Sequence, residues 1–116
     1  MTRILIADDD RHFAELLRAT LDEAGFEAVT AHSGLAAAAL IDREDFDLLV
    51  LDVLMPGVSG DALADQIHQL KPDVPVLLMT GDSGDQFVRG GELPCLRKPF
   101  AGRELVDAVR GLLDAT

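Results

Sequence analysis

Five polar side chains that could take part in chemistry follow directly after apolar runs of the chain. They are Asp8, Asp9, Asp52, Thr80 and Lys98. Three carboxylates that are brought close together repel one another and raise one another's pKa, unless a cation lies between them. A small, hard ion held by a few carboxylates is typical of Mg²⁺, which polarises phosphoryl oxygens and offsets their charge. A carboxylate nucleophile beside such an ion, a hydroxyl and an ammonium predicts a site that forms an aspartyl phosphate.

The candidate nucleophile, Asp52, lies in the stretch 47–60, which reads DLLVLDVLMPGVSG. A short, wholly apolar run closed by proline and glycine indicates a strand that is buried on both faces. An ionised side chain at the end of such a strand is costly unless its surroundings compensate the charge. An ordinary loop aspartate is the plainer interpretation of Asp52, but the apolar run before it and the MPGVSG turn after it disfavour that interpretation.

The elements that must position these side chains follow from the hydrophobic pattern. Apolar runs predict strands at 4–7, 26–31, 48–51, 76–79 and 93–97. Helical spacing predicts helices over 13–24, 35–43 and 61–70, at most a short helix near 85–89, and a last helix through Leu105, Val109 and Leu112. Strands that alternate with helices at this spacing predict an α/β fold, a doubly wound parallel sheet with helices on both faces.

The order of the strands decides which side chains meet. Pro94 cannot donate a hydrogen bond to a strand ladder, so the fifth strand is expected at an edge of the sheet. That agrees with strand order 2-1-3-4-5, in which the switch point lies between the first and third strands. Asp8, Asp9 and Asp52 follow those two strands. We therefore expect the three carboxylates to lie together at the carboxyl edge of the sheet.

Length and composition restrict the class of protein. A chain of 116 residues predicts one domain, 1–116. The formal net charge is -11 and no basic cluster is present, so direct binding of nucleic acid by this chain is not expected. The single cysteine excludes an internal disulfide and fits a reducing compartment. No apolar run reaches membrane-spanning length and no signal peptide is evident, so a cytoplasmic location without membrane contact is expected.

Four motifs in order make the chain similar to the receiver domain of two-component response regulators, which has the flavodoxin-like (βα)5 fold. They are ILIADDD at 4–10, LLVLDVLMPGVSG at 48–60, VLLMTG at 76–81 and LRKPF at 96–100. Each motif alone is a moderate signal, but together they span nearly the whole chain at the spacing of that family.

The resemblance implies a phosphoryl-accepting site. Asp52 would accept a phosphoryl group from a histidine kinase or a histidine phosphotransfer protein. Asp9, Asp52 and the backbone carbonyl of Leu54 would ligate Mg²⁺ directly, and Asp8 would act mainly through a bound water. Such a domain catalyses only its own phosphorylation and dephosphorylation and is not a turnover enzyme.

The resemblance also implies how the signal leaves the site. Thr80 would be the hydroxyl that moves toward the phosphoryl group. Lys98 would contact that group and precede a cis peptide bond at Pro99. The output would be a changed protein-interaction surface that a downstream protein effector recognises.

Three departures from the family pattern affect these expectations. Cys95 stands where the family usually has an aromatic residue, and we interpret it as a small buried hydrophobe, with a redox role left open. The segment 80–98 is short and glycine-rich, which resembles the receivers of hybrid kinases and phosphorelays and predicts a shortened fourth helix. Leu54 and Asp82 occupy positions that tune hydrolysis of the aspartyl phosphate, and a leucine cannot orient an attacking water.

Alternatives from other functional classes remain open. A pseudo-receiver that docks a partner without phosphorylation fits the missing aromatic residue. A small phosphohydrolase acting through Asp52 would need a general acid or base, for which only Asp82 is available. A flavin-binding protein of the same fold is disfavoured because no glycine- or serine-rich phosphate loop follows the first strand. Asp10 is interpreted as the N-cap of the first helix, with contact to the metal as the less favoured role.

Overall fold

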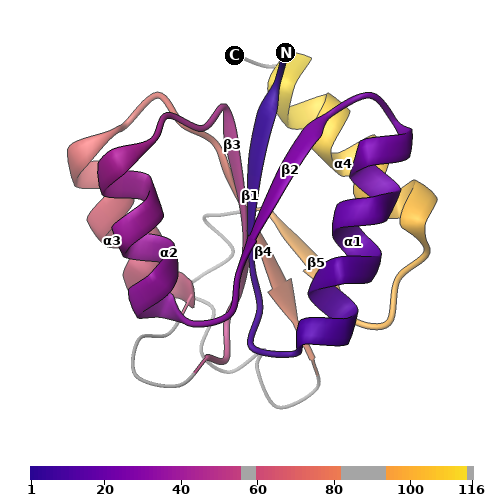
Figure 1. The fold of residues 1–116 in the computed structure, drawn as a ribbon, viewed down its shortest axis with the longest axis horizontal. Helices are drawn as coiled ribbons and strands as arrows, with labels where there is room; N and C mark the ends of the chain where they lie inside the picture. The colour runs from indigo at the N-terminus through magenta and orange to yellow at the C-terminus, as the bar shows by residue number, and fades with distance from the viewer. Residues whose placement is uncertain (56–59, 82–93, 115–116) are drawn as a thin grey trace.

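The computed structural model describes residues 1–55, 60–81 and 94–114. Its centre is a five-stranded parallel sheet with the order β2-β1-β3-β4-β5 (Figure 1). The strands are β1 (Arg3–Ala7), β2 (Glu27–Ala31), β3 (Leu48–Asp52), β4 (Val76–Thr80) and β5 (Cys95–Arg97). The helices of the described residues are α1 (Arg11–Glu23), α2 (Gly34–Arg43), α3 (Gly60–Leu70) and α4 (Gly102–Asp114). The flavodoxin-like fold and the strand order expected from the sequence are confirmed.

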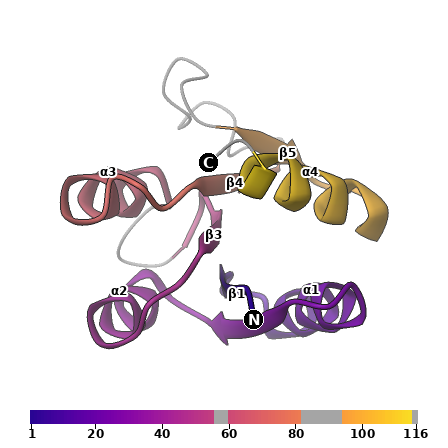
Figure 2. The same cartoon turned by 90° about the horizontal axis from the view of Figure 1, so that it is seen from above.

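The helices cover both faces of the sheet. Helices α2 and α3 lie on one side, and α1 and α4 lie on the other (Figure 2). Successive side chains of the central strands alternate between the two layers, because the side-chain period of a strand is two residues. Leu49 and Leu51 pack against α2 and α3, while Leu48 and Val50 pack against α1 and α4. Burial on both faces explains why these strands read as continuous apolar runs.

The first helix begins and ends as its sequence predicts. The carboxylate of Asp10 accepts a hydrogen bond from the backbone N–H of Phe13 at 3.1 Å, which confirms Asp10 as the N-cap. At the other end, Gly25 has a φ of 97°, a conformation that glycine adopts without steric cost. The N–H groups of Gly25 and Phe26 donate to the carbonyls of Asp22 and Leu21, and together these bonds close the helix as a Schellman motif.

The strand with the proline lies at the edge of the sheet, as expected. Strand β5 pairs only with β4 among the described strands, and the carbonyl of Pro94 accepts a hydrogen bond from the N–H of Leu78 at 2.9 Å. The described part of this strand begins at Cys95. Leu93 and the short helix predicted near 85–89 lie outside the described residues.

Two large leucines of the helices are exposed to solvent. In α1 the buried side chains are Ala14, Leu17 and Leu21, and this face leaves Leu16 62% exposed. In α3, Leu63 and Ile67 are buried, but Leu70 is 77% exposed at the end of the helix. Leu70 borders a groove of about 600 Å³ between α2 and α3. The alanines of α2 on the other side of this groove are too short to cover it.

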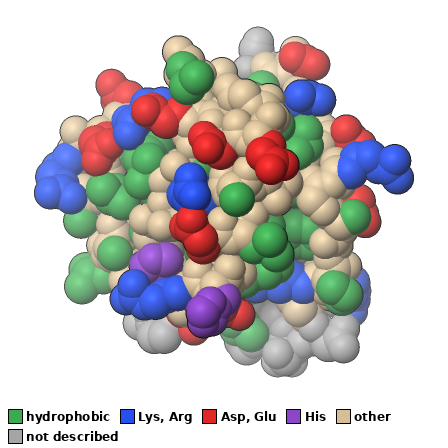
Figure 3. Space-filling model, turned by 45° about the vertical axis from the view of Figure 1, so that its right-hand side comes forward, with side chains coloured by type: hydrophobic (Ala, Val, Ile, Leu, Met, Phe, Trp, Pro, Cys, Tyr) green, Lys and Arg blue, Asp and Glu red, His purple; other side chains and the backbone are tan. Residues whose placement is uncertain are grey.

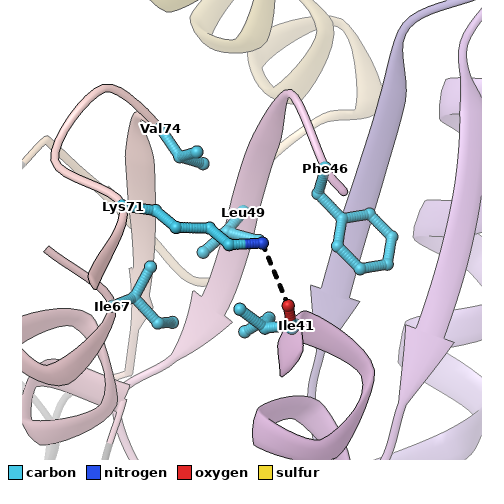
Figure 4. Close-up of a pocket in the computed structure, with 6 residues that line it drawn as sticks. All are labelled: Ile41, Phe46, Leu49, Ile67, Lys71 and Val74. Atoms are coloured by element: carbon cyan, nitrogen blue, oxygen red, sulfur yellow. Dashed lines mark hydrogen bonds between the residues drawn. The ribbon is translucent and has the colours of Figure 1, made fainter. Parts of the chain in front are cut away.

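Lys71, which follows α3, connects the ends of α2 and α3. Its ammonium donates a hydrogen bond to the carbonyl of Ile41 at 3.1 Å, in a small apolar pocket that Leu49 and Ile67 also line (Figure 4). The carbonyl belongs to the last turn of α2, where helical partners run out, so the lysine acts as a C-terminal cap from a neighbouring element.

The surface carries no extended basic area on the side that includes α1 and α4. There, Lys and Arg side chains are scattered singly among Asp and Glu (Figure 3). Within the described parts of the chain, no helix has both the length and the apolar character needed to cross a bilayer.

Candidate functional site

The carboxyl ends of β1 and β3 bring three carboxylates together. The two strands are parallel neighbours, with Ala7 opposite Leu51, so the residues that end them meet at one edge of the sheet. One oxygen from each of Asp8, Asp9 and Asp52 lies within 4.8 Å of the others. Asp8 is completely buried and Asp52 is 7% exposed, whereas Asp9 is exposed to solvent. The structure thus places all three predicted carboxylates in one cluster that opens to solvent on the side of Asp9.

Lysine 98 reaches into this cluster from the end of β5. Its ammonium donates a hydrogen bond to Oδ2 of Asp8 at 3.0 Å and lies 3.4 Å from Oδ2 of Asp52. The peptide bond between Lys98 and Pro99 is cis, as expected from the sequence. Burial disfavours the charged ammonium, but the hydrogen bond that it donates to Asp8 and the charges of both carboxylates outweigh this effect, so the pKa of Lys98 is raised.

The electrostatic balance of the cluster remains negative. Burial, and then the charge of Asp8, raise the pKa of Asp52 to about 6, although Lys98 and the backbone N–H of Leu54 counteract them. The N–H of Leu54 lies 3.3 Å from Oδ1 of Asp52. Three carboxylates face a single ammonium, so the site has an excess of oxygen ligands and negative charge. These are the ligands that a hard divalent cation takes.

The geometry of the carboxylates fits such an ion. In octahedral coordination at about 2.1 Å, oxygens on opposite sides of a Mg²⁺ ion lie about 4.2 Å apart and adjacent ones about 3.0 Å apart. The carboxylate oxygens, which lie within 4.8 Å of one another, would therefore move closer together when an ion binds. Asp10 does not belong to this cluster of the described residues, because its carboxylate caps α1. The predicted ligation by the carbonyl of Leu54 stays a prediction, since the recorded contact of this residue is made by its N–H.

The predicted switch hydroxyl lies at the end of β4. Thr80 is 1% exposed, and its backbone carbonyl accepts a hydrogen bond from the N–H of Lys98 at 2.6 Å. This bond joins the ends of β4 and β5, so the backbones of the two predicted residues are tied together. The side-chain hydroxyl of Thr80 contacts Cys95 rather than Lys98.

The interpretation of Cys95 as a buried hydrophobe is wrong. Its side chain is exposed, because β5 is a three-residue edge strand whose alternate positions face solvent. Cys95 pairs with Leu78 in the sheet, and Thr80, two residues further along β4, projects from the same face. The thiol sulfur lies 3.4 Å from Oγ1 of Thr80, within hydrogen-bonding distance for sulfur. At the position where the resemblance led us to expect an aromatic residue, a small side chain thus contacts the hydroxyl of Thr80.

One residue at the site was not recognised in the sequence. Phe13, in the first turn of α1, places its ring centroid 4.7 Å from the ammonium of Lys98. The ring of Phe100 stands against it edge to face, with centroids 5.8 Å apart and an interplanar angle of 69°. In the sequence, Phe13 reads as one of the apolar positions of a helix. Its place four residues after Asp9 was the available signal, because one helical turn from the strand end keeps a side chain near that edge.

The described side chains can support transfer of a phosphoryl group. A largely buried carboxylate with a raised pKa is a better nucleophile than an ordinary one, although a smaller fraction of it is ionised. The neighbouring carboxylates can hold a cation, and the ammonium can pair with an anionic oxygen. Among the five candidate residues, four make direct contacts or share the carboxylate cluster, while Thr80 adjoins them through its backbone bond to Lys98.

Comparisons with known proteins agree with this architecture. The model of the response regulator receiver domain family matches residues 4–110. The transcriptional regulatory protein CpxR of Klebsiella pneumoniae is 42% identical over 120 residues, which cover 97% of this chain and 50% of that protein. The chain spans between about a quarter and a half of the length of the curated relatives that it matches.

Two solved structures show the same fold over nearly the whole chain. A CheY-like response regulator receiver domain protein from Methanospirillum hungatei has a TM-score of 0.90 at 27% identity, covering 99% of this chain and 95% of that one. The response regulator TrrA from Thermotoga maritima, in complex with Mg²⁺ and BeF, has a TM-score of 0.83 at 33% identity. That match covers 97% of this chain and 99% of TrrA.

Proposed function

From the premise that this chain belongs to the family of response regulator receiver domains, we propose that it is a phosphoacceptor signalling domain. It takes a phosphoryl group from a histidine kinase or a histidine phosphotransfer protein onto Asp52, with Mg²⁺ as cofactor. One observation carries the proposal. The Asp52 carboxylate, nearly buried at the end of β3, lies within 4.8 Å of two further carboxylates and 3.4 Å from an ammonium.

The chain's own residues account for the steps of the transfer. An ionised oxygen of Asp52 attacks phosphorus and forms a new P–O bond. The P–N bond to the donor imidazole breaks, and the imidazole leaves with the electron pair of that bond on its nitrogen. Asp9, Asp52 and the backbone carbonyl of Leu54 would hold Mg²⁺ directly, and Asp8 would hold it through a bound water. The ion would offset the charge of the phosphoryl oxygens. Lys98 pairs with one of these oxygens, and the hydroxyl of Thr80 donates a hydrogen bond to another. Because the pKa of Asp52 is about 6, most of it is ionised and competent at neutral pH.

The output and the partners are part of the same proposal. Movement of Thr80 toward the phosphoryl group would alter the surface around β4 and β5, which a downstream protein effector would recognise. The relatives are longer regulators, two of them named as transcriptional regulatory proteins, so the effector could be covalently linked or separate. The negative net charge and the scattered basic side chains argue against direct binding of nucleic acid by this domain. A cytoplasmic location fits a partner kinase that uses ATP.

Incubation with acetyl phosphate tests the proposal directly. Intact-mass spectrometry is expected to show a single added phosphoryl group in the presence of Mg²⁺ and none when the metal is chelated. An absence of any adduct, combined with no response to beryllofluoride, would favour the docking module that acts unphosphorylated. Continuing release of product from a phosphomonoester would favour the phosphohydrolase.

Substitution of Asp9 by asparagine is expected to weaken Mg²⁺ binding with little effect on the fold. Asp9 is the exposed member of the cluster, so its replacement should change the free energy of unfolding by about 0.5 kcal/mol or less. Its loss should weaken the affinity for Mg²⁺ by about tenfold or more, since a hard cation depends on charged oxygen ligands. The Mg²⁺-dependent rise in Tm, measured across a metal titration, reports this affinity.

The matched control is Asp10→Asn, which makes the same chemical change one residue later. Asparagine is as good an N-cap as aspartate, so α1 should keep its cap. We expect this variant to keep the metal-dependent rise in Tm. If Asp9→Asn responded to Mg²⁺ as the wild type does, the assignment of Asp9 as a ligand would be wrong.

Leucine 54 is expected to prolong the life of the aspartyl phosphate. Its side chain is 40% exposed beside Asp52 and offers no hydrogen bond to an attacking water. In Leu54→Asn, an amide that orients the water should accelerate loss of the phosphoryl group by roughly fivefold, the equivalent of one hydrogen bond of about 1 kcal/mol. Decay of the phosphorylated mass after removal of the donor gives the rate. Leu54→Met is the control that keeps the side chain apolar, and equal decay in all three proteins would contradict the prediction.

A further inference from the structure

Among the described residues, three groups lie next to the ammonium of Lys98: two carboxylates and one aromatic ring. The carboxylates of Asp8 and Asp52 lie 3.0 and 3.4 Å away, and the ring centroid of Phe13 lies 4.7 Å away. We propose that Phe13 is a positioning residue whose ring keeps the Lys98 ammonium at the site while the carboxylates are engaged elsewhere. The inference rests on the proposed phosphoacceptor function.

The attraction between the two carboxylates and the ammonium changes when the site binds a metal ion or becomes phosphorylated. Asp8 and Asp52 are also the residues that would hold the divalent cation, and Asp52 loses its negative oxygen when it forms the P–O bond. A divalent ion competes with an ammonium for the same lone pairs. The face of an aromatic ring attracts a cation through its quadrupole and binds neither the metal nor a phosphoryl group. Phe13 is therefore the neighbour of Lys98 whose attraction persists through the reaction.

Local hydrogen bonds fix the ring relative to the carboxylates. Oδ1 of Asp8 accepts a hydrogen bond from the N–H of Asp10 at 2.9 Å, and Oδ1 of Asp10 accepts one from the N–H of Phe13 at 3.1 Å. These two bonds connect the buried carboxylate to the first turn of α1 within six residues of chain. The position of the ring is thus set by the same segment that supplies Asp8 and Asp9.

A second aromatic ring packs against the first. Phe100 lies two residues after Lys98 and meets Phe13 edge to face at 5.8 Å. Both phenylalanines pack at the border of the apolar cluster between the sheet and helices α1 and α4. Phe13 is therefore held between this cluster and the ammonium, and a leucine there would fill part of the space without offering a ring face.

Ordinary packing is the competing explanation for Phe13, and two substitutions separate the two roles. Phe13→Leu keeps an apolar side chain but removes the ring, whereas Phe13→Tyr keeps the ring. If the ring positions Lys98, phosphorylation by acetyl phosphate at saturating Mg²⁺ should slow about five- to tenfold in Phe13→Leu. It should stay within about twofold of the wild type in Phe13→Tyr. Urea unfolding of each variant, followed by circular dichroism, verifies that the protein compared is folded.

The chain also allows a direct measurement of the contact. It contains two lysines, Lys71 and Lys98, so selective ¹³C labelling of lysine gives two sets of side-chain NMR signals. Lys71 lies at the far end of α3, where its ammonium contacts Ile41 and Asp45, and it serves as an internal reference. In the Mg²⁺-bound protein, the ring should shift the ε-methylene protons of Lys98 upfield. The shift should vanish in Phe13→Leu and remain in Phe13→Tyr, while the Lys71 signals stay constant.

Each outcome decides the proposal. Equal phosphorylation rates in wild type and Phe13→Leu, or an unchanged Lys98 signal in that variant, would overturn it. Equal slowing in folded Phe13→Leu and Phe13→Tyr would assign the effect to packing. If the wild type took up no phosphoryl group, the proposed function would fail, and the Lys98 shift with Mg²⁺ alone would still show whether the ring holds the ammonium.

Discussion

Replacement of Asp52 by asparagine is expected to abolish uptake of the phosphoryl group completely. The amide cannot supply the anionic oxygen that forms the P–O bond, and the other two carboxylates are poorly suited to replace it. Asp8 is fully buried with its oxygens bonded to Lys98 and to the N–H of Asp10, and Asp9 is exposed to solvent. Intact-mass spectrometry with acetyl phosphate and Mg²⁺ should show the added phosphoryl group in the wild type and only the unmodified mass in Asp52→Asn.

The control for this experiment is again Asp10→Asn. It makes the same change of carboxylate to amide near the site, but at a residue whose carboxylate caps α1. We expect this variant to be phosphorylated at a rate within about threefold of the wild type, because asparagine preserves the cap. Persistent phosphorylation of Asp52→Asn would show that the acceptor is another residue.

Removal of the same charge is also expected to stabilise the metal-free protein at neutral pH. Burial and the charge of Asp8 raise the pKa of Asp52 from its ordinary value of 3.8 to about 6. The folded protein therefore binds this proton more tightly than the unfolded chain does, and ionisation of Asp52 costs stability. The difference corresponds to at most about 3 kcal/mol at neutral pH. Because asparagine gives up part of the contact with Lys98, we expect Asp52→Asn to gain between about 1 and 3 kcal/mol.

The gain should depend on pH in a defined window. Below about pH 4, Asp52 is protonated in both the folded and the unfolded state. Its titration then adds little to the difference in free energy of unfolding between the wild type and Asp52→Asn. As the pH rises from about 4 through about 6, the wild type loses the stability that the variant keeps, and the difference is complete above about pH 7.

Urea unfolding followed by far-UV circular dichroism gives the free energies, since the chain contains no tryptophan for fluorescence. The measurement compares wild type, Asp52→Asn and Asp10→Asn in the presence of a chelator. A constant difference between wild type and Asp52→Asn across the whole pH range would show that the pKa of Asp52 is not raised by the fold. Mg²⁺ should reduce the difference, because the ion stabilises the wild-type carboxylates and has one ligand fewer in the variant.

The raised free energy of the metal-free site has a functional meaning. Three carboxylates and one ammonium gathered at a strand end are unfavourable on their own, and a divalent cation relieves their repulsion. In the proposed function, this cluster would favour binding of a metal ion and, with it, of an anionic phosphoryl group. The ionised carboxylate of Asp52 lowers the folding stability but is the form that can react with a phosphoryl group. Such opposition between stability and reactivity is common at functional sites.

The fold and the meeting of the three carboxylates could be predicted from the sequence alone. Buried strands such as Leu48–Asp52 read as unbroken apolar runs because both of their faces are covered, and Pro94 placed the last strand at an edge. Once the strand order was known, Asp8, Asp9 and Asp52 had to meet, since the carboxyl ends of neighbouring parallel strands share one edge. Asp10 was recognised as the N-cap of the first helix because capping depends on local backbone geometry.

What the tertiary structure alone decided are the contacts between side chains distant in the sequence and the exposure of each residue. The ring of Phe13 lies over Lys98 because α1 and the end of β5 approach each other in space, across more than eighty residues of chain. Cys95 is exposed, against our expectation, because a short edge strand has no neighbour on one side. The pKa of Asp52 likewise depends on how deeply the fold buries it and how near it brings Asp8. Hydrophobic periodicity and capping are local properties that a sequence records directly, whereas desolvation and cross-element distances arise only when the elements pack.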